Sequence, residues 1–397
     1  MDTLAPVLDW RPETPVSGYH RFHPDVSLNF QCNRWVQWIG ADAHDADAHD
    51  EVSALAAHAN SYPEWIDGFL DLAQHADSCQ RPLAGAYYSR AAEFFMAPDD
   101  PRRPTIRDRF LTQMRNLYQV HPIEVPYRGQ GRYGVLPTYD LLPPRTPIDT
   151  IIVFGGFDSY IEEFLPLMTG LRQAGYRVIA FDGPGQGSAL EDHHLPITPA
   201  WEKPVGAVLD HLGIDHDVTA IGVSLGGGLV IRAAAFEPRL RRVIAFDILD
   251  DELEVAARQV GRGAATILRV LLSLRARAVI NAVAGWSAHR KPISAWALQQ
   301  GMHITGTDTA YDFLTAARAT QTHTISGNVT ADVLLLAGAD DHYVPLHQLH
   351  RQATALTKAR SVTTRVFTCT EQASNHCQVG NFGLALRFSL AWLESLG

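Results

Sequence analysis

The pattern of apolar and polar positions divides the chain into three regions. Over roughly residues 1–120, segments such as WIDGFLDLAQHA and AGAYYSRAAEFFM carry apolar residues at every third or fourth position, which is typical of amphipathic helices. From about His121, short apolar runs alternate with helical segments. Between about 248 and 329 a long helical stretch interrupts this alternation, which resumes at ADVLLLAG. The pattern predicts a helical N-terminal domain and a second domain split by a helical insertion.

The alternating region predicts a sheet. HPIEVPYRGQGRYGVLPTYDLLP is expected to form two strands around a glycine-containing turn. Further strands are expected at TIIVFGG, YRVIAFDGPGQG, DVTAIGVS, LRRVIAFD, ADVLLLAG and SVTTRVF. Unbroken apolar strands separated by helices indicate an α/β fold with a mostly parallel sheet covered on both faces. We expect a helical domain at 1–120, a two-part core at 121–247 and 330–397, and a helical lid at 248–329.

Composition and charge exclude several classes of function. The formal net charge of −10 and the lack of a basic stripe make nucleic acid an unexpected partner. The longest apolar stretch, around TILRVLLSL, is too short to span a bilayer, so no membrane partner is expected. The first residues carry no basic segment followed by an apolar run, and the four cysteines show no C-x-x-C spacing. These features predict a cytoplasmic protein with reduced thiols.

The segment ADAHDADAHDE, residues 41–51, gathers histidines and aspartates. Such a cluster can form a weak metal site. A solvated helix start with N-capping aspartates explains it equally simply and is the interpretation we favour. No metal or organic cofactor is therefore expected.

The segment GVSLGGG contains the main candidate for chemistry. Ser224 lies between Gly222 and Gly226, after a predicted strand and before a predicted helix. In that context G-x-S-x-G predicts a nucleophile elbow, a sharp turn on which the serine Oγ projects above the sheet. A glycine-rich turn without chemistry is the alternative, and a catalytic base and acid elsewhere in the chain would decide between the two.

The chain offers an acid and a base in the order that this arrangement requires. Asp341 follows the predicted strand ADVLLLAG, and the spacing in GADDHYVP favours it over the adjacent Asp340. His376 lies between the last predicted strand and the terminal helix, where a loop can fold over the serine. His342 and His347 lie on a different loop. We expect His376 to act as the base and Asp341 to orient it.

An oxyanion hole requires two hydrogen-bond donors. The backbone N–H of Leu225 is expected to provide one. The loop after TIIVFGG is expected to provide the other, most simply through the N–H of Phe157, because Gly155 and Gly156 allow that backbone to come close. The glycines of FDGPGQG lack the spacing of a nucleotide-binding loop and predict only a tight strand exit.

The ordered set FGGFDSYIEE, AFDGPGQG, GVSLGGG, GADDHYVP and NHCQVG resembles the α/β-hydrolase superfamily over residues 121–397. GGFDSYIEE, HCQ and the helical YYSRAAEFF are similar to one subgroup. That subgroup includes 2,6-dihydroxypseudooxynicotine hydrolase, fungal heptaketide-shortening pigment hydrolases and FrsA-like esterases. The resemblance implies an N-terminal domain that helps to cover the site, and a homodimer is an option because dimers are common in the subgroup. It also implies either cleavage of a carbon–carbon bond next to a ketone or ester hydrolysis.

The expected substrate is a small carbonyl compound with aromatic or polyketide-like character. C–C bond hydrolysis through an acyl-enzyme on Ser224 is the favoured reaction. A carboxylesterase or thioesterase, an acyltransferase or cyclase, and a ligand-binding protein on a hydrolase fold remain alternatives. Some C–C hydrolases use an additional acid, for which the chain offers Asp247, Asp250, Asp251 and Glu254, although DILDDELE can equally cap and start a helix.

Aromatic residues of the lid and of the N-terminal helices are consistent with an apolar pocket. They are Trp286, Trp296, Tyr87, Tyr88, Phe94 and Phe95. Ordinary packing explains the same residues, since their helical spacing is what a core requires.

Overall fold

The computed structural model of the protein describes residues 17–40, 47–258, 261 and 263–397. The chain divides into two compact units. Unit 1 comprises residues 1–121, 162–175 and 368–397, and unit 2 comprises residues 122–161 and 176–367. Within the described residues no helix is long and apolar enough to cross a membrane.

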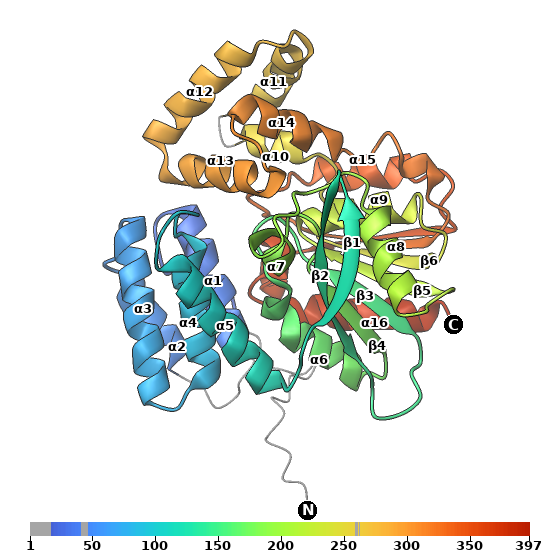
Figure 1. Ribbon diagram of the computed structural model, residues 1–397, viewed down its shortest axis with the longest axis horizontal. Coiled ribbons are helices and arrows are strands. Elements are labelled where there is room, and N and C mark those ends of the chain that lie inside the picture. Colours follow the sequence, from blue (N-terminus) through green and yellow to red (C-terminus); the bar gives the residue numbers. More distant parts are fainter. Residues whose placement is uncertain (1–16, 41–46, 259–260, 262) are drawn as a thin grey trace, which may run out of the picture. The chain divides into compact units, whose positions relative to one another are not determined.

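An eight-stranded sheet forms the centre of unit 2 (Figure 1), in the order β1-β2-β4-β3-β5-β6-β7-β8. β1 and β2 pair antiparallel, as do β2 and β4, and all other neighbours are parallel. The parallel strands β3 to β8 therefore end at the same edge, where ligand sites of such sheets lie. From β1 to β8 the strands span Ile123–Gly129, Arg132–Leu141, Thr150–Phe154, Arg177–Phe181, Val218–Val223, Leu240–Phe246, Asp332–Gly338 and Ser361–Phe367.

Burial explains why the central strands read as unbroken apolar runs. Every residue of β5 and β7 is buried, as expected for strands with both faces covered. Helix α9 packs against β5 and β6, while α8 packs against β1 and α9. The helices of this part of unit 2 are α7 (Gly187–Glu191), α8 (Glu202–His211), α9 (Leu225–Ala234) and α15 (His347–Ala355).

In the described residues between β6 and β7 lie five α-helices, which we call the insertion helices (Figure 1, yellow to orange). They have a small apolar core of their own, which is centred on Leu253, Leu272, Ile280 and Phe313. Their bounds are α10 (Glu252–Arg258), α11 (Ala264–Ser273), α12 (Arg277–Arg290), α13 (Pro292–Thr305) and α14 (Ala310–Ala319).

Unit 1 is helical, and its N-terminal helices pack around α4. Nearly every residue of α4 is buried, including Tyr87 and Tyr88. Ser61 caps α3 by accepting a hydrogen bond from the N–H of Glu64, and a proline follows in the first turn. The helices are α1 (Val26–Ile39), α2 (Ala48–Ala56), α3 (Tyr62–Ser78), α4 (Pro82–Phe94), α5 (Arg103–Tyr118), α6 (Leu165–Gln173) and α16 (Phe382–Ser395).

A buried charge network connects two of the sequence motifs within unit 1. Arg90 Nε, from the YYSRAAEFF segment, donates to Glu163 Oε1 of SYIEE at 2.7 Å. Arg34 also pairs with Glu163, and the Tyr87 hydroxyl donates to the Glu163 carbonyl at 2.9 Å. Because the Glu163 side chain is fully buried, its charge is stabilised by the two arginines in place of water. The two motifs thus form one structural feature, although 73 residues separate Arg90 from Glu163.

Local features set the starts of three helices. A 3₁₀ turn over Ile161–Phe164 precedes α6, which starts at Leu165. The terminal helix α16 begins at Phe382, because Gly380 adopts a φ of +107° and Asn381 caps the helix. The short helix α7, directly after the glycine-rich exit of β4, was not expected.

Candidate active site

Ser224 occupies a strained turn between β5 and α9. Its φ of 61° and ψ of −120° lie in a region that non-glycine residues rarely adopt. The Ser224 N–H donates to the carbonyl of Phe246 at 2.7 Å, and the Ser224 carbonyl accepts from the N–H of Gly227 at 2.8 Å. These bonds hold the turn, and such strain persists only where the surroundings determine the conformation.

The glycines of the run 226–228 admit the backbone of two other segments. A Cβ at Gly226 would lie 2.5 Å from the carbonyl oxygen of Gly155. At Gly227 the distance to the carbonyl oxygen of Asp247 would be 1.8 Å, and at Gly228 the distance to that of Leu249 would be 2.2 Å. The first turn of α9 therefore packs directly against the exits of β3 and β6.

The loop after β3 lies beside the serine. A Cβ at Gly156 would be 2.9 Å from Ser224 Cβ and 3.1 Å from the Leu225 nitrogen. The Gly156 N–H donates to Ser159 Oγ at 3.1 Å, so the N–H of Phe157 is the next donor along this loop. The structure thus brings the two segments expected to form the oxyanion hole together, with Leu225 buried at the start of α9.

Gln186 holds this loop from the side of β4. Its Nε2 donates to the carbonyl of Gly155 at 2.7 Å and to that of Gly156 at 3.3 Å. Its Oε1 accepts from the N–H of Gly183 at 3.1 Å. The adjacent Asp182 accepts from the N–H of Ile161, at the far end of the same loop, at 2.9 Å. The segment AFDGPGQG therefore fixes the position of the loop after β3 through hydrogen bonds.

The insertion helices also contact this loop. Gln300 Nε2, on α13, donates to the Phe157 carbonyl at 3.2 Å. The rings of Phe157 and Trp296 meet edge to face with centroids 6.3 Å apart. Phe157 thus packs between the sheet core and the core of the insertion helices. Trp296 is partly buried, whereas Trp286 is mostly exposed and lies outside this contact.

Asp341 is held in the turn after β7. Its Oδ1 accepts from the backbone N–H groups of Tyr343 at 2.7 Å and Val344 at 2.9 Å. The residue is buried, whereas the adjacent Asp340 is exposed. Two backbone donors on one oxygen fix the orientation of this carboxylate. This geometry favours Asp341 over Asp340 as a group that could orient a histidine.

His376 belongs to unit 1, whereas the other four candidate residues belong to unit 2. It begins a 3₁₀ turn that ends at Gln378, nine residues after the end of β8. Within unit 1 its ring lies 6.2 Å from that of Phe30 on α1. His376 is buried, and Asn375, not His376, takes the N-cap position of the turn.

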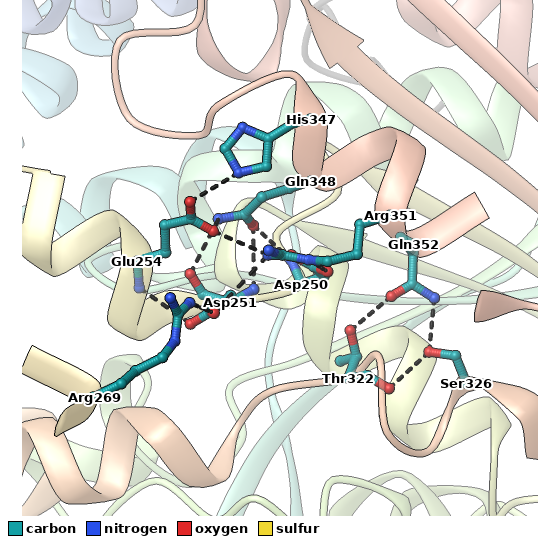
Figure 2. A network of polar contacts seen from close by, with 10 residues as sticks. All are labelled: Asp250, Asp251, Glu254, Arg269, Thr322, Ser326, His347, Gln348, Arg351 and Gln352. Carbon is teal, nitrogen blue, oxygen red and sulfur yellow. Dashed lines mark hydrogen bonds and ion pairs between the residues drawn. The ribbon is translucent and has the colours of Figure 1, made fainter. Parts of the chain in front are cut away.

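Three of the additional acids considered above are engaged in ion pairs (Figure 2). Arg351 bonds both carboxylate oxygens of Asp250 and pairs with Glu254 at 3.0 Å, while Asp251 pairs with Arg269. Hydrogen bonds to Asp250 raise the pKa of Arg351, so its guanidinium stays charged. Asp251 also caps α10 by accepting from the N–H of Glu254. The segment DILDDELE therefore joins the insertion helices to α15, and Asp247 is buried against α9.

Sequence reasoning missed one acid of the same segment, Glu252. Its side chain accepts from Thr320 Oγ1 at 3.1 Å, at the end of α14. Its Oε1 is buried and has no hydrogen-bond partner among the described residues. Burial raises the pKa of Glu252 to about 7, helped by the nearby charge of Asp251. Only the tertiary contact across the insertion distinguishes Glu252 from its acidic neighbours.

The aromatic residues of unit 1 and the acidic segment 41–51 were also considered as candidate groups. Tyr88 donates to Glu51, and Phe95 stacks on Tyr62, so these aromatic residues of unit 1 belong to its core. Residues 41–46 of the acidic segment lie outside the described residues. Asp47 takes the N-cap position of α2 without a capping side-chain bond, and Asp50 lies in the first turn of that helix.

Residues 149–379 match the family described as alpha/beta hydrolase fold, and the chain belongs to this family. The hydrolase acrC of Aspergillus aculeatus is 28% identical over 75% of this chain and 76% of its own length. The 20-hydroxy-prefusarin hydrolase of Gibberella moniliformis is 32% identical over 43% of this chain and 45% of its own length. The crystal structure of 2,6-dihydroxy-pseudo-oxynicotine hydrolase superposes with a TM-score of 0.59, at 20% identity over 83% of this chain and 87% of that one.

These matches confirm the expected α/β-hydrolase fold and an enzyme of the hydrolase class. The likeness to 2,6-dihydroxy-pseudo-oxynicotine hydrolase concerns the fold, because the identity is low. For most of the fungal relatives, the matched region is less than two thirds of their own length.

Proposed function

We propose that the protein is a serine hydrolase that forms an acyl-enzyme on Ser224. The observation that carries this proposal is the backbone of Ser224, with a φ of 61° at a strand-to-helix turn and the loop after β3 packed against the Leu225 nitrogen. A turn of this kind presents Oγ at the carboxyl edge of the sheet, next to the positive end of α9. We assign Asp341 and His376 as the remaining members of the triad, and lid and covering-domain roles to the insertion helices and the N-terminal helices.

The proposed chemistry begins when Ser224 Oγ attacks a substrate carbonyl and His376 accepts its proton. The N–H groups of Leu225 and Phe157 bind the oxyanion that develops. Asp341 keeps the imidazole in the required tautomer and stabilises the imidazolium. Collapse of the tetrahedral intermediate breaks the bond to the leaving group, which takes the proton from His376. Water, activated by the same histidine, then hydrolyses the acyl-enzyme.

Among carbonyl substrates, we propose a ketone whose C–C bond is cleaved. The leaving group is then a carbanion, so the substrate itself must stabilise it, as a β-diketone or an electron-rich phenol does. The resemblance in the segments around Phe157, His376 and Arg90 supports this choice, as do relatives named as hydrolases of 2,6-dihydroxy-pseudo-oxynicotine and 20-hydroxy-prefusarin. The aromatic pair Phe157 and Trp296, which includes a residue of the loop after β3, favours an apolar, aromatic or polyketide-like substrate.

Labelling with a fluorophosphonate, read by intact mass, tests the nucleophile. We expect one phosphonyl group on the wild type, none on Ser224→Ala, and labelling of His376→Ala slowed by about 10³-fold or more. A folded wild type that resists labelling, or a Ser224→Ala variant that labels normally, would contradict the proposed nucleophile. Saturable ligand binding that is unchanged in Ser224→Ala would point to a binding protein instead.

A β-diketone and a matched ester, each incubated in D₂O, test the proposed reaction. C–C hydrolysis should release equal amounts of an acid and a ketone, with solvent deuterium at the new C–H bond and at the positions of the diketone that exchange with solvent. Turnover of the ester alone would identify an esterase. Transfer of the acyl group to an added alcohol or amine, with little free acid, would identify an acyltransferase.

A further inference from the structure

Two of the insertion helices, α11 and α12, each expose a series of apolar side chains, which we together call the α11–α12 patch. On α11 and at its end, Ile267, Val270 and Leu274 follow each other at spacings of three and four residues and are 62%, 53% and 72% exposed. On α12, Val279, Val283 and Trp286 repeat this spacing. Exposed apolar residues that gather in this way, rather than scatter singly, indicate an interaction surface.

The patch is not the core face of these helices. The small core of the insertion is filled by Leu272 of α11 and Ile280 of α12, with Leu268 and Leu271 packed against it. α11 is therefore apolar on both sides. A helix of this kind in an aqueous protein requires a second apolar environment for its outer side.

Basic residues border the patch, and two of them, Arg269 and Arg277, are paired with Asp251 and Asp312. Between Val255 and Thr307 the sequence contains seven basic residues and no acidic residue, in a chain with a formal net charge of −10. Arg275 is exposed in the turn between the two helices, and the Arg290 guanidinium lies over the Trp286 ring at 4.5 Å. An apolar stripe bordered by arginine, with a tryptophan at its margin, is the composition of helices that lie in the headgroup region of a membrane.

We propose that the α11–α12 patch binds the surface of a membrane that contains anionic lipids. The apolar side chains would enter the boundary between headgroups and acyl chains, and the arginines would bind lipid phosphates and carboxylates. The stretch TILRVLLSL, too short to span a bilayer, is long enough to lie on one. This proposal departs from the expectation that the protein has no membrane partner, which rested on the absence of a spanning segment, and it does not depend on the proposed reaction.

Charge and composition favour a lipid surface over a second copy of the chain. A two-fold symmetric dimer through this patch would bring Arg275 and Arg290 of both copies into one interface, which is unfavourable. Protein interfaces also carry hydrogen-bonding groups, whereas the outward side chains of the patch are aliphatic apart from Trp286. Insertion into the lipid boundary requires no hydrogen-bonding groups on the apolar side chains of the patch.

Co-sedimentation of the full chain with vesicles tests the proposal. Vesicles of phosphatidylcholine with phosphatidylserine are compared with vesicles of phosphatidylcholine alone, at low and high salt. We expect about tenfold stronger binding to the anionic vesicles, reduced by salt. The double variant Ile267→Asp, Leu274→Asp should lose binding by about tenfold or more, and Arg275→Glu with Arg290→Glu should remove the preference for anionic lipid.

The matched control is Leu142→Asp with Ile148→Asp, because these residues are similarly exposed, at 56% and 69%, but lie outside the insertion. It should bind vesicles as the wild type does. The proposal is overturned if the wild type binds neither vesicle, or if the control and the Ile267, Leu274 variant lose binding equally. Sedimentation velocity without lipid tests whether the patch binds a second copy of the chain. A wild-type dimer that becomes monomeric in the Ile267, Leu274 variant, without vesicle binding, would assign the patch to a second copy.

Discussion

The first turn of α9 and the helix α12 both contain glycine, but the two glycine sites have opposite surroundings. Around Gly227 the carbonyl of Asp247 would lie 1.8 Å from an added Cβ, whereas around Gly285 of α12 nothing lies within 4 Å. In the first region, backbones of different segments touch, so individual positions accept only glycine. In the second region, one side of each helix packs and the other is open, so the structure requires only that the packed positions are apolar. The proposed chemistry lies in the first region.

The largest expected effect is that of Gly227→Ala. The new methyl group can be accommodated only if α9 and the segment after β6 move apart, because the atom that it meets is backbone. We expect a loss of about 3 kcal/mol or more in the free energy of unfolding, with loss of labelling at Ser224. Urea unfolding and fluorophosphonate labelling measure the two effects. A loss below about 1 kcal/mol would show that the close packing around α9 is not needed for stability.

The second prediction concerns Glu252, which joins α10 to α14 at the base of the insertion. Because burial raises its native pKa from 4.5 to about 7, the native state holds this proton more tightly than the unfolded chain. The free energy of unfolding should therefore fall as the pH rises from about 4.5 to about 7, and stay lowered above that. Glu252→Gln should be close to the wild type at pH 5 and more stable by up to about 3 kcal/mol at pH 8.

Urea unfolding at both pH values, with Glu254→Gln as the control, tests this prediction. Glu254 pairs with Arg351 and His347, so its neutral variant should lose stability instead of gaining it. If Glu252→Gln has the same effect at pH 5 and pH 8, the group does not titrate in this range.

The third prediction compares the two glutamines that hold the loop after β3. Gln186→Met removes three hydrogen bonds from buried backbone groups, whereas Gln300→Met removes one bond to the Phe157 carbonyl from the insertion side. We expect Gln186→Met to slow fluorophosphonate labelling and kcat by about tenfold or more, with a smaller change in KM. Gln300→Met should change these rates by less than about threefold. Equal effects would mean that the insertion holds the loop as firmly as the sheet does.

The same contrast explains what the sequence could predict. The strands and the turn at Ser224 follow from local patterns: unbroken apolar runs, and small residues two positions on either side of the serine. The role of Gln186 could not be predicted, because its bonds to Gly155 and Gly156 join residues about 30 positions apart. Glu252 is a similar case, since its partner Thr320 is 68 residues away. Local periodicity carries no information about such contacts.

The smallest expected effect is that of Gly285→Ala, the counterpart of Gly227→Ala. Gly285 lies inside α12 without a positive φ, and its surroundings are open, so alanine should improve helix propensity without a clash. We expect a gain of about 0.5–1 kcal/mol in the free energy of unfolding and an unchanged labelling rate at Ser224. Urea unfolding again gives the measurement. A destabilised variant would mean that another surface covers α12 at Gly285, which would favour a protein partner over a lipid surface for the adjacent α11–α12 patch.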